Sequence, residues 1–290
     1  MLSSQQSESH VEPSRSSQHY YDGRSVVLQV GRTLYKLPAS LLRRRSSVFN
    51  DLFDLPPTQD PEGCSDETPI VLQGVTEADF DHLMTFLWGS NPEQKPPTLP
   101  YLIAVLKLSD LWDIQDGREY AIPQLELQRD FNNFLKLSCA VKYHVDHWVA
   151  DSFRSLLLLD LDEYQPGQID ELGLRVYTAL SFVRFKLDKF RRSLSYGDPP
   201  FSQSVACMTP KRCQAAWLSI WNDRFAKMLI HPDVPTGAAS VLIAIGDVIG
   251  EVEGLCALCH NASWQDLTDT GVSLREEAII QAGIDGLRGL

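Results

Sequence analysis

The stretch from Tyr21 to Leu55 constrains the fold of this chain more than any other part of its sequence. Two short apolar runs, VVLQV and TLYKL, are separated by Gly31-Arg32. A two-residue loop that begins with glycine predicts a β-hairpin with a type II′ turn, because glycine readily adopts the positive φ that this turn needs. Pro38 follows with the φ of a first helical turn, so a short helix that contains Leu41 and Leu42 is expected next.

A second helix is predicted after Arg43-Arg44-Arg45, whose charges suit the C-terminus of the first. Ser46 or Ser47 can cap the start of this second helix with a side-chain oxygen. Its apolar residues fall on one helical face and are Val48, Phe49, Leu52 and Phe53. Pro56-Pro57 ends it.

This order of a hairpin, a short helix and a Ser-Ser-x-Phe helix resembles the opening of a BTB (POZ) domain, in the form abundant in mushroom-forming fungi. The resemblance continues through PIVLQGV at Pro69–Val75, DFDHLMTFLW at Asp79–Trp88 and VLKLSDLWDIQDGREYAIPQLE at Val105–Glu126. It implies an α+β domain over residues 21–126, a short sheet with packed helices, preceded by a disordered tail over residues 1–20. Ser25 and Pro38 stand where many family members have Asp and His, so the charged groove of repressor-type members is not implied.

An all-α C-terminal domain is expected over residues 127–290, because no convincing strand pattern appears after Leu127. The helices expected there include 133–142, 174–195, 211–229 and an apolar helix over 241–259, and Ser273 with Glu276 would form a capping box for the last one. Aromatic and aliphatic residues recur at helical spacing within 211–229 and are expected to be buried: Trp217, Ile220, Trp221 and Phe225.

Charge and composition exclude several classes of function. A net charge of −12 argues against a nucleic-acid duplex as the main partner, because phosphate binding needs a basic face. The sequence has neither a run of about 18 apolar residues nor an apolar N-terminal segment, so no membrane span and no secretory signal are expected. We therefore expect an intracellular protein, in the cytoplasm or the nucleus, whose cysteines are reduced thiols. Because the chain lacks G-x-S-x-G, P-loop and G-x-G-x-x-G motifs, neither an enzyme nor a small-molecule substrate is predicted.

The resemblance implies a protein–protein interaction module that forms a homodimer. In BTB domains the first strand and the first two helices usually form the dimer face, which here nominates Leu41, Leu42, Val48 and Leu52 as protein-binding residues. Burial of the same side chains in the chain's own core is the alternative. Many BTB proteins are adaptors for cullin-type ubiquitin ligases or act in transcription. Asn91-Pro92-Glu93 has the Glu of the hydrophobic-x-Glu insert that some adaptors carry but lacks its apolar residue, so an adaptor role is left open.

The sequence Cys256-Ala-Leu-Cys259-His260 is a candidate for cofactor chemistry in the helical half. It matches a c-type haem attachment, but that modification requires export. A redox pair requires a helix N-terminus, whereas this pair is expected at the end of the 241–259 helix. Zinc is the better functional alternative, with Cys207 and Cys213 as further ligands, although Cys-x5-Cys is looser than a typical zinc knuckle. The sequence therefore favours cysteines packed as small apolar residues, and no metal, cofactor or catalytic residue is predicted.

Overall fold

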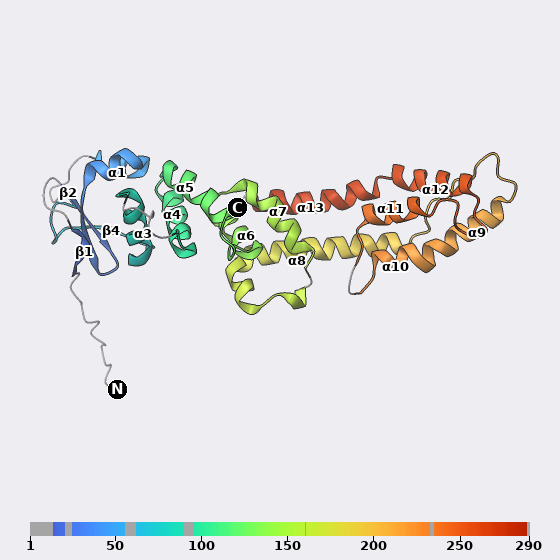
Figure 1. Cartoon of the computed structure of the whole chain (residues 1–290), viewed down its shortest axis with the longest axis horizontal. Helices are drawn as coiled ribbons and strands as arrows, with labels where there is room; N and C mark the ends of the chain where they lie inside the picture. The colour runs from blue at the N-terminus through green and yellow to red at the C-terminus, as the bar shows by residue number, and fades with distance from the viewer. Residues whose placement is uncertain are drawn as a thin grey trace, which may run out of the picture. The chain divides into compact units, whose positions relative to one another are not determined.

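The computed structural model describes residues 14–20, 25–55, 62–89, 96–159, 161–232 and 235–288. The chain divides into two compact units, residues 1–132 and 133–290, whereas the sequence placed the boundary after Glu126. The first unit contains a mixed four-stranded sheet with helices, and the second is helical (Figure 1). No helix in the described ranges is long and apolar enough to cross a membrane.

The sheet of the first unit has the strand order β1-β3-β2-β4. Strands β2 (Ser25–Val30) and β3 (Thr33–Pro38) pair antiparallel with Val30 opposite Thr33, which confirms the predicted hairpin. Gly31 has a φ of +58° and Arg32 does not have a positive φ, which is the pattern of a type II′ turn. The two outer strands, β1 (Ser14–Tyr20) and β4 (Ile70–Leu72), pair parallel with β3 and β2, respectively.

Strand β1 corrects the predicted tail. Its sequence, SRSSQHY, lacks the alternating apolar residues by which a strand is recognised, so the expectation of a tail is wrong for residues 14–20. Polar contacts hold it instead: Arg15 Nε donates to Asp66 Oδ2 at 2.7 Å, and the Tyr20 hydroxyl donates to the same carboxylate. The remainder of the predicted tail, residues 1–13, lies outside the described residues.

Helices α1 (Ala39–Arg45) and α2 (Ser47–Phe53) follow the hairpin as predicted, and Ser46 Oγ caps α2 by accepting from the Phe49 N–H at 3.1 Å. The described part of the unit has three further helices, α3 (Glu77–Leu87), α4 (Leu99–Leu111) and α5 (Gln115–Glu126). Helix α5 continues through Pro123, although a proline inside a helix lacks the N–H for one of its hydrogen bonds. Ala121 and Leu125 are buried around this proline, and their packing outweighs the hydrogen bond that Pro123 cannot donate.

The core of the first unit lies between the sheet and its helices. Side chains from β2, β3, α1, α2, α3 and α4 meet there without exposure to solvent. Its fully enclosed members include Leu28, Val30, Leu37, Leu42, Phe80, Leu83, Met84 and Leu108. The Tyr35 and Phe80 rings meet edge to face at 4.6 Å, and burial raises the pKa of Tyr35 well above its ordinary value.

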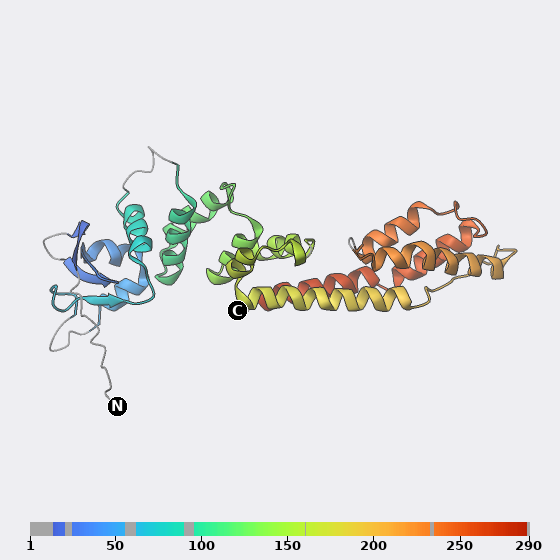
Figure 2. The ribbon, with the colours of Figure 1, turned by 90° about the horizontal axis from the view of Figure 1, so that it is seen from below.

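The second unit begins with α6 (Asn133–Lys142), α7 (Asp146–Leu157) and a short 3₁₀ turn, η2 (Leu161–Glu163). Helices α8 (Pro166–Tyr196) and α13 (Val272–Arg288) lie side by side along much of their length (Figures 1 and 2). Gln165 is the N-cap of α8 and forms a capping box with Gln168, and Pro166 is the first residue of the helix. The helix bends at Gly173, which has a φ of +75°.

Five elements pack around a second core: α9 (Pro210–Ile220), the π-turn η3 (Trp221–Phe225), α10 (Ala226–Leu229), α11 (Ala238–Asp247) and α12 (Ala257–Asp269). Trp217, Trp221 and Phe225 are buried there as predicted, and Ile220 is half-buried. The prediction of a single helix over 241–259 is wrong, because two helices, α11 and α12, share this region. Gly250 and Gly254 have φ values of +85° and +81°, and these left-handed residues turn the chain between α11 and α12.

The capping box predicted for the last helix is also not formed as expected. The Glu276 carboxylate accepts from the Ala238 N–H at 2.5 Å and from Arg191 Nε at 2.6 Å. Glu276 therefore accepts a hydrogen bond from a backbone N–H in the first turn of α11 instead of capping the start of its own helix, α13. Its partners come from two other helices, α11 and α8.

Candidate functional site

The structure separates the residues nominated for protein binding into core and surface. Leu42 is fully buried among the residues of the first core, so its nomination as a surface contact is wrong. Leu41 and Leu52 are half-buried and pack against that core. Val48 is 42% exposed on the outer side of α2. We call Leu41, Val48 and Leu52 the α1–α2 face.

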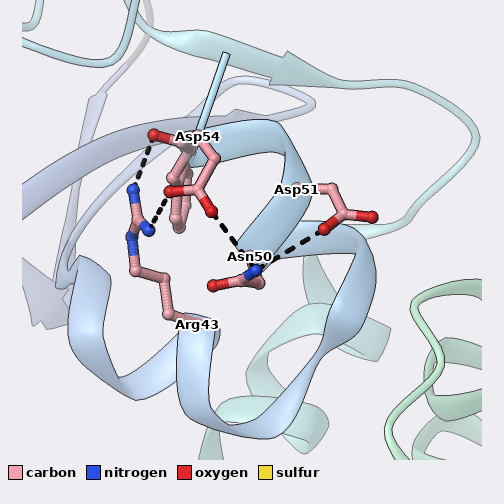
Figure 3. A network of polar contacts seen from close by, with 5 residues as sticks. Arg43, Asn50, Asp51 and Asp54 are labelled. Atoms are coloured by element: carbon pink, nitrogen blue, oxygen red, sulfur yellow. Dashed lines mark hydrogen bonds and ion pairs between the residues drawn. The ribbon is translucent and has the colours of Figure 1, made fainter.

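Polar contacts fix α1 against the end of α2 (Figure 3). Arg43 donates to the Phe53 carbonyl oxygen at 2.6 Å and pairs with the Asp54 carboxylate. Asn50 donates to Asp54 Oδ2 at 3.4 Å within α2 and its C-cap. A charged side chain from α1 thus binds the last turn of α2, and these contacts link the two short helices that carry the α1–α2 face.

The structure also assembles a four-cysteine cluster in the second unit. The Sγ atoms of Cys207, Cys213, Cys256 and Cys259 all lie within 4.8 Å of one another, and those of Cys207 and Cys213 are 3.6 Å apart. Cys207 lies in the loop before α9, Cys213 in the first turn of α9, Cys256 at the N-cap of α12 and Cys259 in the first turn of α12. Cys213 and Cys259 are buried, whereas Cys207 and Cys256 are half-buried.

Local sequence explains why the two helix starts meet at this cluster. Pro210 begins α9, and proline is favoured in a first turn because its missing N–H costs nothing there. Gly254 turns the chain into α12, and a Cβ at that position would lie 3.4 Å from Arg212 Nε and 3.5 Å from the Ala216 Cβ. These are ordinary contact distances, so the loop runs directly beside α9, and the φ of +81° at Gly254 sets the turn that brings Cys256 beside Cys213.

Backbone N–H groups point at the sulfur atoms of the cluster. Ser204 N–H donates to Cys259 Sγ, Cys256 N–H to Cys213 Sγ and Cys259 N–H to Cys256 Sγ, each at 3.4 Å. The Cys259 N–H lowers the pKa of Cys256 to about 7, and burial raises the pKa of Cys259 to about 12. The expectation that this pair ends a helix, where the dipole opposes a thiolate, is therefore corrected: Cys256 caps a helix N-terminus.

His260 follows the cysteine pair but lies in the packed interior. It is fully buried, its ring centroid lies 5.6 Å from that of Trp217, and neither ring nitrogen has a hydrogen-bond partner among the described residues. Burial lowers the pKa of His260, which favours the neutral imidazole over the charged one. The two other cysteines are elsewhere: Cys64 is exposed in the first unit, and Cys139 is buried in α6.

Comparison with protein-family models found no match for this chain, and a search of curated proteins found none either. Its function is therefore inferred from the residues of the α1–α2 face and of the four-cysteine cluster.

Proposed function

We propose that the protein is an interaction protein that self-associates through the α1–α2 face of its BTB-like N-terminal unit. The observation that carries this proposal is the exposure of Val48, 42%, on a helix pair that Arg43 links through the Phe53 carbonyl oxygen. The order of hairpin, α1, α2, β4 and α3 is the order that the BTB resemblance implies, which supports the same assignment.

The charges beside the α1–α2 face favour a second copy of this chain as the occupant. Arg44 is exposed on α1 and Asp51 is exposed on α2, so the face has a basic and an acidic border. In a two-fold dimer each patch meets itself in reverse orientation. The axis would pass near Val48 and bring Arg44 of one chain toward Asp51 of the other, while the apolar side chains between them lose their contact with water.

The proposal covers self-association. Recruitment of a further protein, in ubiquitin ligation or in transcription, would use residues in addition to this face. The candidate adaptor segment, Asn91-Pro92-Glu93, lies outside the described residues.

The test is light scattering of the full chain over a dilution series, with Val48→Asp as the variant. Val48 is preferred to Leu52, because Leu52 packs against the core and its replacement by Asp would disturb the fold as well. Leu111→Asp is the matched control, since Leu111 is 51% exposed on another helix of the same unit. We expect a dimer for the wild type and for the control, and at least about tenfold weaker association for Val48→Asp, because an unpaired carboxylate is costly in an apolar interface.

Circular dichroism should show the same helix content for all three proteins. A wild type that is monomeric at high micromolar concentration contradicts the proposal. Dimerisation of Val48→Asp with wild-type affinity would show that a different surface joins the chains.

A further inference from the structure

The four-cysteine cluster has the dimensions of a metal site. A tetrahedral ion with metal–sulfur distances of about 2.3 Å places its sulfur atoms about 3.8 Å from one another. All four Sγ atoms lie within 4.8 Å of one another, and the Cys207–Cys213 pair, at 3.6 Å, is already at that spacing. We propose that Cys207, Cys213, Cys256 and Cys259 bind one zinc ion in a closed structural site with no position for a substrate.

The backbone around the cluster is arranged for thiolates. The sulfur atoms of Cys213, Cys256 and Cys259 each accept a main-chain N–H at 3.4 Å. Such outer contacts orient metal ligands and support the negative charge on sulfur. A set of thiols that merely fills space between helices does not need a main-chain donor directed at three of its four sulfurs.

The groups around the cluster can compensate the charge of a metal–thiolate complex. Four thiolates and one divalent ion have a net charge of −2, which needs compensation. The N-termini of α9 and α12 both meet at the cluster, and a helix N-terminus stabilises negative charge. Arg212 adds a full positive charge near the cluster. It lines a shallow hollow together with Thr209, Gly254, Leu255 and Cys256. This hollow also gives the ion a path to Cys256.

Exposure argues against packing alone. Small apolar residues are expected to be buried, as Cys213 and Cys259 are, but Cys207 and Cys256 are half-buried. All four are free thiols, and 3.6 Å between Cys207 and Cys213 is far longer than a disulfide bond of about 2.05 Å. Multi-iron clusters hold their cysteine sulfurs further apart, and Mg²⁺ and Ca²⁺ prefer oxygen ligands. Zinc fits both the ligand type and the spacing.

The ion would connect segments that are distant in sequence. It would tie the loop before α9 and the first turn of α9 to the start of α12, beside the core that contains Trp217 and Leu255. In a chain without disulfides among these residues, the metal would serve as a cross-link, and its binding energy would contribute to folding. Removal of the metal is therefore expected to loosen these segments first.

The test is elemental analysis of the full chain, purified without chelators and without metal-affinity resin. We expect about one zinc per chain for the wild type, and less than about a tenth of that for Cys256→Ser. Serine is an effective N-cap, so this variant keeps the start of α12 while it removes a soft ligand. Cys64→Ser is the control, since Cys64 lies in the first unit, and it should retain the metal. Reconstitution of the wild type with Co²⁺ should give the intense absorption of tetrahedral cobalt thiolate.

A measurement on the wild type covers the case in which Cys256→Ser fails to fold. Alkylation of the native protein, mapped by mass spectrometry, should modify Cys207 and Cys256 slowly with zinc and rapidly after chelation, while Cys64 reacts at the same rate in both. The proposal is overturned if the purified protein takes up neither zinc nor cobalt. It is also overturned if Cys256→Ser binds metal like the wild type, if iron occupies the site in place of zinc, or if chelation does not change the reactivity of Cys207 and Cys256.

Discussion

Replacement of Gly283 by alanine tests the packing of α13 in the second unit. A Cβ added at Gly283 would lie 2.4 Å from Val183 Cγ2 and 3.1 Å from Phe153 Cζ. Carbon atoms in contact prefer about 3.5–4.0 Å, so the valine would have to move by more than an ångström. Phe153 and Val183 are buried among α7 and α8, where close packing leaves little room for such a movement.

The expected magnitude is the balance of two opposing terms. Overpacking a core costs about 1–3 kcal/mol. Alanine in place of glycine within a helix contributes about 0.5–1 kcal/mol in the stabilising direction, mainly through the unfolded chain. Gly283→Ala should therefore lower the free energy of unfolding by up to about 2.5 kcal/mol.

Gly286 provides a matched control on the same helix. Nothing lies within 4 Å of a Cβ added at Gly286, so Gly286→Ala should raise the free energy of unfolding by about 0.5–1 kcal/mol. Urea unfolding followed by far-ultraviolet circular dichroism compares the two variants with the wild type. If Gly283→Ala is as stable as Gly286→Ala, α13 does not approach α7 and α8 as closely as described here.

Three further predictions concern other contacts. Trp217→Ala should cost about 3–5 kcal/mol in denaturant unfolding, because the side chain is fully buried and its Nε1 donates to the Pro200 carbonyl at 2.9 Å; a loss below about 1 kcal/mol would contradict this burial. Asp66→Asn should speed hydrogen exchange in β1 while the β2–β3 hairpin is unchanged. The Tyr20 hydroxyl lowers the pKa of Asp66, so the stabilisation of β1 by Asp66 is present above the ordinary aspartate pKa and is lost as pH falls through the lowered pKa. If neither Asp66→Asn nor the fall in pH alters hydrogen exchange in β1, the role of Asp66 is refuted. Glu276→Gln should destabilise the second unit by about 1–3 kcal/mol, since the bond to Ala238 is weakened and Arg191 loses its partner, and an unchanged unfolding midpoint would argue against this contact.

Features fixed by neighbouring residues were predictable from the sequence. The hairpin follows from Gly31-Arg32, whose left-handed glycine is a local requirement. The start of α2 follows from Ser46, whose hydroxyl reaches an N–H three residues away. The helix with Trp217 and Trp221 follows from spacing, because its apolar face is continuous.

Features fixed by distant residues were not predictable in the same way. β1 has a polar sequence, and its partners are a strand and Asp66, far along the chain. The apolar run over 241–259 predicted one helix, but the helix is interrupted by a turn that depends on the backbone angles of Gly250 and Gly254. The loose Cys-x5-Cys spacing argued against zinc, yet the turn at Gly254 brings Cys256 beside Cys213. Glycines inside an apolar run were the signal that could have placed the cysteine pair at a helix start.

Hydrogen exchange of the full chain at two protein concentrations tests the proposed self-association most directly, because it locates the interface without any substitution. At high concentration the amides and side-chain environment of α1 and α2 should lose access to water, so the exchange of residues 39–53 should slow, while that of α13 should not change. Equal exchange of α1 and α2 at both concentrations, or slower exchange confined to another part of the chain that does associate, would contradict the assignment of the interface to the α1–α2 face.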